Sequence, residues 1–232
     1  SSGVLTGTDN TAIGRLAGDD LTSGTHNNFM GYNAGASATT ADYSIAIGYS
    51  AMGTGGVTGD DNTAIGRLSG QYLTSGSQNF FGGYSAGQNA TTADYGIAIG
   101  YEAIGIGVMT GVDNTAIGRQ AGNDLTSGTA NFFGGTLAGY NATTATNTVA
   151  IGKQAIGAGV LTGTDNVAIG FAAGNDLTSG GYNTFMGYIA GSNATTASYT
   201  IGIGSGAISL GVLTGTDNTA IGRGAGADLT SG

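Results

Sequence analysis

The sequence repeats itself every 52 residues, and this period constrains the fold more than any other feature. Residues 10–14 (Asn-Thr-Ala-Ile-Gly) recur at 62–66, 114–118 and 218–222, and 166–170 differ only by Val167 in place of Thr. Weaker copies at 27–31 and 44–48 divide the first long repeat into steps of 17, 17 and 18 residues, so thirteen short units fill the chain. A period this short predicts a solenoid in which each unit is one coil resting on its neighbours.

Composition narrows the class of protein. The chain has 48 glycines, no proline, no cysteine and 40% apolar residues, in a positional pattern that a disordered chain does not need. The net charge of −9 argues against nucleic acid as a partner. No apolar run approaches the ~20 residues of a membrane span, so we expect no membrane insertion of this segment. The chain starts and stops inside a unit, and we expect residues 1–232 to be a single repetitive domain from a longer fibre.

Superposing the units predicts the coil. The fourth residue after the Asn position is Gly in all thirteen units, which marks a place where the backbone turns or packs very closely. Each unit offers two short extended segments, x-Ala-Ile-Gly and Leu-Thr-Ser-Gly, and frequent Gly disfavours a helix. We therefore predict an all-β, parallel β-solenoid (β-roll) of about thirteen 17–18-residue coils, with two strands per coil. A three-sided left-handed helix is the second choice.

The Ala-Ile strand is apolar on both faces. Phe29, Phe81, Phe133 and Phe185 replace Ala in the middle unit of each long repeat, and Gly82 accompanies Phe80, as expected for a close-packed layer. One face fills the inside of the coil, and we expect a second copy of the chain to cover the other. The predicted interface column is Ile13, Ile47, Ile65, Ile99, Ile117, Ile151 and Ile169, with its Ala or Phe neighbours.

All five cations occupy one position, directly after the invariant Gly, and aromatic residues fill most other units there. Coils ~4.8 Å apart would stack these side chains into a cation–π row. One interpretation is a surface stripe that binds a host-surface glycan or protein receptor. The other, which we favour, is stabilisation of the coil or contact between protomers. The candidate residues are Arg15, Tyr32, Tyr49, Arg67, Tyr84, Tyr101, Arg119 and Tyr188.

Other polar motifs carry weaker signals. Asp9, Asp61, Asp113, Asp165 and Asp217 recur once per long repeat, and turn chemistry explains them more simply than calcium. Asn89, Asn141 and Asn193 each begin an Asn-Ala-Thr glycosylation motif. The single histidine, His26, has no repeat partner with which to build a catalytic triad or a metal cluster. We therefore expect no enzyme activity, no metal and no cofactor.

The Asn-Thr-Ala-Ile-Gly…Ala-Gly unit with its Gly-Thr-Asp-Asn lead resembles the head repeats of trimeric autotransporter adhesins. It is equally similar to the Asn-Thr-Ala-Ile-Gly repeats of bacteriophage tail-fibre proteins. The resemblance covers the whole chain and implies a left-handed parallel β-roll in a homotrimeric fibre. It also implies an extracellular place, on a cell surface or a virion.

The sequence thus predicts a non-enzymatic fibrous surface protein, the head or shaft of an adhesin or phage tail fibre that mediates attachment to a host. One alternative is a solenoid whose Ser/Thr face binds ice or polysaccharide. Another is a purely structural extracellular filament.

Overall fold

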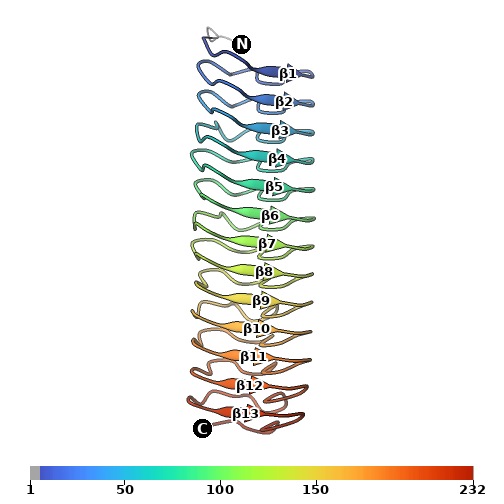
Figure 1. Cartoon of the computed structure of the whole chain (residues 1–232), viewed down its shortest axis with the longest axis vertical. Coiled ribbons are helices and arrows are strands. Elements are labelled where there is room, and N and C mark those ends of the chain that lie inside the picture. Colours follow the sequence, from blue (N-terminus) through green and yellow to red (C-terminus); the bar gives the residue numbers. More distant parts are fainter. Residues whose placement is uncertain (1–5, 232) are drawn as a thin grey trace. The chain divides into compact units, whose positions relative to one another are not determined.

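A computed structural model of the protein describes residues 6–231. Every regular element in this range is a β-strand of three residues, and there are thirteen of them. No helix occurs in this range, and hence none that could cross a membrane. The chain divides into two compact units, Ser1–Asn114 and Thr115–Gly232, each a stack of coils (Figure 1).

The strands of each unit pair in parallel and in chain order. The first unit holds β1 (Thr11–Ile13), β2 (Asn28–Met30), β3 (Ile45–Ile47), β4 (Thr63–Ile65), β5 (Phe80–Gly82) and β6 (Ile97–Ile99). The second holds β7 (Thr115–Ile117), β8 (Phe132–Gly134), β9 (Val149–Ile151), β10 (Val167–Ile169), β11 (Thr184–Met186), β12 (Ile201–Ile203) and β13 (Thr219–Ile221). Thr11 pairs with Asn28, Asn28 with Ile45 and Ile45 with Thr63, the predicted steps of one coil. The all-β class and the parallel solenoid are confirmed.

The second strand predicted for each coil is wrong. The Leu-Thr-Ser-Gly segment is irregular, with three isolated bridges in the second unit. It keeps some bonds between coils, such as Thr22 N–H to the Thr39 carbonyl at 3.0 Å. Three residues later, however, the Thr25 N–H donates to the Asp42 carboxylate at 2.6 Å instead of to a backbone carbonyl. Because side-chain oxygens accept these bonds, a continuous backbone ladder does not form.

The invariant Gly after each strand is where successive coils approach most closely. Gly48 has a φ of 135°, and a Cβ placed on it would lie 2.6 Å from the Gly66 carbonyl oxygen of the next coil. In the second unit Gly187 has the same φ and would meet the Gly204 oxygen at 2.6 Å. Both the conformation and the contact exclude a larger residue, as the sequence predicted.

The core explains why the long repeat contains three coils. In the first coil Leu21 is the largest buried side chain, in the second it is Phe29, and in the third it is Met52 beside Val57. The phenyl ring of Phe29 packs against the preceding coil and against the return segment of its own coil. A Cβ on Gly18 would lie 3.1 Å from this ring, and one on Gly35 would lie 2.6 Å from it. The 52-residue period is therefore one cycle of core packing.

Buried asparagines directly before the strand hold the coils together in two of the three coils of a long repeat. Asn79 donates from Nδ2 to the Ala93 carbonyl at 2.7 Å and to Asn62 Oδ1 at 3.0 Å. Its own Oδ1 accepts the Gly96 N–H of the next coil at 2.8 Å. Asn183 repeats this arrangement in the second unit. These amides satisfy backbone groups that would otherwise be buried without partners.

Candidate functional site

The outward side of the strands is a mostly apolar surface, with Thr or Asn at the first position of six strands, and we call it the strand face. In β2 to β13 the middle residue points into the coil and is buried, while the first and last residues point outward. Ile65 and Ile117, which end β4 and β7, are each 42% exposed. The predicted interface column lies on this face: Ile13, Ile47, Ile65, Ile99, Ile117 and Ile151 are exposed, and Ile169 is half-buried.

Side chains on the strand face fit one another within each coil. The Phe80 ring bends over Gly82, so that a Cβ on Gly82 would lie 3.3 Å from its Cε1. The Phe132 ring covers Gly134 in the same way, at 3.1 Å. The large residue therefore fills the place that its small neighbour leaves, which keeps the face level as predicted from the sequence.

The Arg/Tyr row follows the strands, one residue after the invariant Gly, and in the first unit it is one continuous stack. Tyr32 and Tyr49 stack with ring centroids 5.1 Å apart. Arg67 lies 5.7 Å from the Tyr49 ring and 5.6 Å from the Tyr84 ring. Arg15 stacks on Tyr32 at 5.6 Å, and Tyr84 on Tyr101 at 5.1 Å. The predicted row is therefore real, and it offers a partner ring edges and hydroxyls, because ring faces are used within the stack.

The same row is interrupted in the second unit. Lys153 lies 5.8 Å from the Phe171 ring, and Phe171 stacks on Tyr188 at 5.3 Å. Thr136 and Ser205 stand at the same position in the coils before and after these three. Arg119 and Arg223 are exposed at either end of the row.

A second row, the Asp/Tyr row, lies at the other end of the strands and was not identified from the sequence. Its members stand two residues before each strand, with φ values between 53° and 60°. Tyr182 and Tyr199 stack there with centroids 4.9 Å apart, and His26 and Tyr43 with centroids 4.7 Å apart. The row is Asp9, His26, Tyr43, Asp61, Gln78, Tyr95 and Asp113 in the first unit, and Ala130, Asn147, Asp165, Tyr182, Tyr199 and Asp217 in the second.

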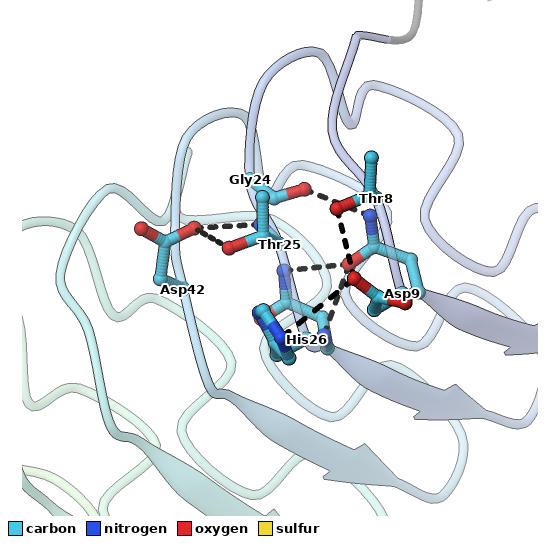
Figure 2. Close-up of polar contacts among 8 residues, drawn as sticks. Thr8, Asp9, Gly24, Thr25, His26 and Asp42 are labelled. Atoms are coloured by element: carbon cyan, nitrogen blue, oxygen red, sulfur yellow. Dashed lines mark hydrogen bonds and ion pairs between the residues drawn. The ribbon is translucent and has the colours of Figure 1, made fainter.

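Hydrogen bonds between coils occupy the polar side chains next to this row. Figure 2 shows the Asp42 carboxylate reaching both the N–H and the hydroxyl of Thr25 in the preceding coil, at 2.6 and 3.0 Å. Asp60 accepts the Asp42 N–H and Asp94 accepts the Ser77 N–H in the same way. In these bonds a carboxylate oxygen accepts the backbone N–H in place of the carbonyl oxygen that would accept it in a regular parallel ladder.

The recurring aspartates of the Asp/Tyr row adopt a left-handed backbone conformation, which Asp tolerates better than most residues. Asp9 also accepts the Thr8 hydroxyl at 2.9 Å, and its carboxylate lies 3.7 Å from His26 Nε2 (Figure 2). Among residues 6–231 no group of three or more His, Asp or Glu side chains is placed to hold a metal ion. Turn geometry accounts for these aspartates.

The carboxyl group of Asp124 lies apart from both rows, and its surroundings change its pKa. Burial raises the pKa of Asp124 above the ordinary value of 3.8. Asp124 lies in the irregular return segment of its coil, where its N–H donates to the Tyr140 carbonyl at 3.0 Å.

The asparagines of the glycosylation motifs are engaged with the next coil. Asn89 Nδ2 donates to the Ile106 carbonyl at 2.9 Å, and Asn141 Nδ2 to the Ala158 carbonyl at 2.9 Å. Asn193 Nδ2 makes the equivalent bond to the Leu210 carbonyl at 3.3 Å and a shorter one to the Ser209 carbonyl at 2.9 Å. The nitrogen that a glycan would modify therefore holds the longer, 18-residue coil in place.

The described residues form no pocket. Their candidate site is the strand face with its two bordering rows. Comparisons of the chain with protein-family models, with curated proteins and with solved structures found no match in any of the three.

Proposed function

We propose that this chain is part of a non-enzymatic attachment fibre, the head or shaft of an adhesin or a phage tail fibre outside the cell. In the proposed fibre three copies of a left-handed solenoid associate side by side through their strand faces. The observation that carries the proposal is the exposed apolar strand face, which continues from coil to coil within each unit.

The energetic argument rests on exposed area. Large apolar side chains stand outward on the strand face of both units, among them Ile65, Phe80 and Ile97 in the first and Ile117, Phe132 and Ile151 in the second. A contiguous apolar patch of this kind is unusual on a monomer and marks an interaction site. Each Å² of apolar surface removed from water contributes ~25 cal/mol. Burial of the strand face therefore favours association, and a partner with the same spacing between coils can cover it along its length.

Sedimentation of the unmodified chain tests the proposal, and the expected species at micromolar concentration is a trimer. Ile65→Asp combined with Ile117→Asp should give monomers, because a charge buried in an apolar contact is costly. Both side chains are already exposed in the single chain, so the monomers should remain folded by circular dichroism. A matched pair, Thr92→Asp and Thr144→Asp, changes exposed residues away from the face and should leave the trimer intact. A folded monomer for the unmodified chain would refute the proposal.

The Ser/Thr alternative has one favourable observation and one against it. An exposed Ser or Thr, such as Ser75 and Thr92, stands four residues before the buried position at the start of each strand. The next outward position is half-buried, and Ser77 and Asp94 there bond to neighbouring coils. Only one column of exposed hydroxyls therefore runs along this side of the coils. A flat surface that binds ice or polysaccharide needs at least two such columns side by side. Thermal hysteresis by the chain would favour this alternative, as would retention on insoluble polysaccharide. A purely structural filament would show association without attachment to cells.

A further inference from the structure

The strand face is bordered by two rows that carry opposite charges at the same level of the stack at several strands. Asp61 stands two residues before β4, and Arg67 stands two residues after it. Asp9 and Arg15 flank β1 in the same way, and Asp217 and Arg223 flank β13. At β1, β4 and β13 an acid of the Asp/Tyr row thus has a base of the Arg/Tyr row at the same level of the stack.

The aromatic residues follow the same rule. Tyr43 and Tyr49 flank β3, Tyr95 and Tyr101 flank β6, and all four rings are exposed. In the second unit Tyr182 lies opposite Tyr188 across β11. The match is incomplete: it fails at β10, where Asp165 faces Phe171, and also at β5, β9 and β12. These three strands are flanked by Gln78 and Tyr84, by Asn147 and Lys153, and by Tyr199 and Ser205.

An Asp and an Arg of the same level lie at opposite ends of their own strand. They are six residues apart in the chain, with the strand between them, which at ~3.3 Å per residue separates their Cα atoms by up to ~20 Å. Arg67 instead lies over tyrosine rings, and its charged group is exposed. The complementarity between the rows is therefore suited to a contact with another chain.

Symmetry decides which arrangement of two chains uses this complementarity. Rotation about an axis parallel to the stacking direction keeps every coil at its own height, and it brings the Arg/Tyr row of one copy against the Asp/Tyr row of the next. An antiparallel arrangement instead brings each row against the same row of the other copy, so that no Asp meets an Arg and like charges repel wherever they align. A slip of one coil, ~4.8 Å, places Asp9 and Asp61 against aromatic residues, although in one direction it brings Asp165 level with Lys153, and a slip of three coils restores the match.

We propose that the strand face is covered by a second copy of this chain, parallel and in the same axial register, with the Arg/Tyr row of one copy on the Asp/Tyr row of the next. This inference rests on the proposed side-by-side fibre and adds its polarity and register. It assigns the Arg/Tyr row to the contact between copies, in place of a receptor site. The Asp/Tyr row then has a role beyond its turns.

Charge reversal tests the pairing. Asp9→Arg with Asp61→Arg should raise the dissociation constant of the assembly about tenfold or more, because like charges then face each other. Adding Arg15→Asp and Arg67→Asp to the same chain should restore association. Asp20→Arg with Asp228→Arg makes the same change in net charge on exposed residues of the return segments, and it should have little effect. An equal loss in the control, or no rescue by the fourfold variant, would overturn the inference.

Cysteine pairing tests the register, since the chain has no cysteine of its own. Gln78→Cys with Tyr84→Cys, which flank β5, should form disulfides between chains on mild oxidation, whereas neither single variant should do so. Gln78→Cys with Tyr49→Cys, two coils out of step, should cross-link poorly. Efficient cross-linking by a single variant would indicate an antiparallel contact, and failure of the matched pair in an intact oligomer would exclude this register. A monomeric unmodified chain would refute the proposed fibre itself, which separates the two failures.

Discussion

The two units of this chain have the same interior and different edges. Phe81 in the first unit and Phe185 in the second are fully buried at equivalent positions, and the Asn79 and Asn183 amides make equivalent bonds. The Arg/Tyr row, by contrast, is one continuous stack in the first unit and is interrupted by Thr136 and Ser205 in the second. The coil therefore tolerates breaks in the row but repeats its interior faithfully. The interior specifies the fold, and the edges are free to serve contacts.

The largest expected effect comes from the closest contact between coils. Gly48→Ala and Gly187→Ala should each destabilise the chain by about 3–5 kcal/mol, since strain at positive φ adds to a clash with the next coil. Equal losses in thermal or urea unfolding would support an identical interior in both units. Gly56→Ala is the control, because Gly56 has a φ of 69° but nothing within 4 Å of an added Cβ. If Gly48→Ala costs no more than Gly56→Ala, the close contact is unimportant.

The asparagine column should have the next largest effect. Asn79→Ala leaves the Gly96 N–H and the Ala93 carbonyl without their partner, and Asn183→Ala does the same to Thr200 and Ala197. Each variant should lose about 2–3 kcal/mol of unfolding free energy. The exposed Asn28→Ala provides the comparison and should be close to neutral. A large difference between the two units would show that their interiors are not equivalent.

The Arg/Tyr row should distinguish the units. Tyr84 stacks between Arg67 and Tyr101, whereas the ring contact found for Tyr188 is with Phe171. Tyr84→Ser should therefore cost about 1–2 kcal/mol and Tyr188→Ser about half as much. The melting temperature should be compared at a protein concentration where sedimentation shows one assembly state. Equal losses would mean that stacking along the row does not stabilise the coil.

The smallest effect concerns pH and one carboxyl group of the second unit. The raised pKa of Asp124 means that the folded state holds its proton more tightly than the unfolded state. Its ionisation therefore lowers stability as the pH rises above the ordinary carboxyl pKa of about 4. Asp124→Asn should raise the melting temperature by about 1–3 °C at pH 7 and leave it unchanged near pH 2. Asp20→Asn, on an exposed carboxyl, is the matched comparison. A gain for Asp124→Asn that persists at pH 2 would contradict a desolvation cause.

Much of the coil could be predicted because its period is visible in the residues that point inward. The spacing of strands, their parallel pairing and the close approach at Gly48 all follow from invariant small residues in fixed positions. The second strand could not be excluded from sequence, because whether the Thr25 N–H meets a carbonyl or the Asp42 carboxylate depends on three-dimensional contact. A side-chain oxygen that accepts a hydrogen bond in place of a backbone carbonyl leaves no periodic pattern in the sequence.

The Asp/Tyr row was missed for a related reason. Its positions hold Asp, Tyr, His, Gln, Asn and Ala, and their common property is the left-handed backbone conformation. Tyr43 and Asp61 look unrelated in the sequence, yet they occupy equivalent turns in neighbouring coils. A residue before the Asn position with φ near 55° is a signal that only the structure provides. The association of strand faces between copies stays a prediction, and so does attachment of the fibre to a host receptor.

The three-coil cycle of the core also limits how such a chain can change its length. Loss of residues 27–43 alone would remove Phe29 and leave the space above Gly18 without its ring, whereas a tandem copy of that coil would place one phenyl ring against another. Loss or duplication of a whole 52-residue segment preserves the core, the asparagine column and the match between the two edge rows together. Recombination between repeats can thus be tolerated in whole cycles, each of which would change the reach of a fibre by ~14 Å.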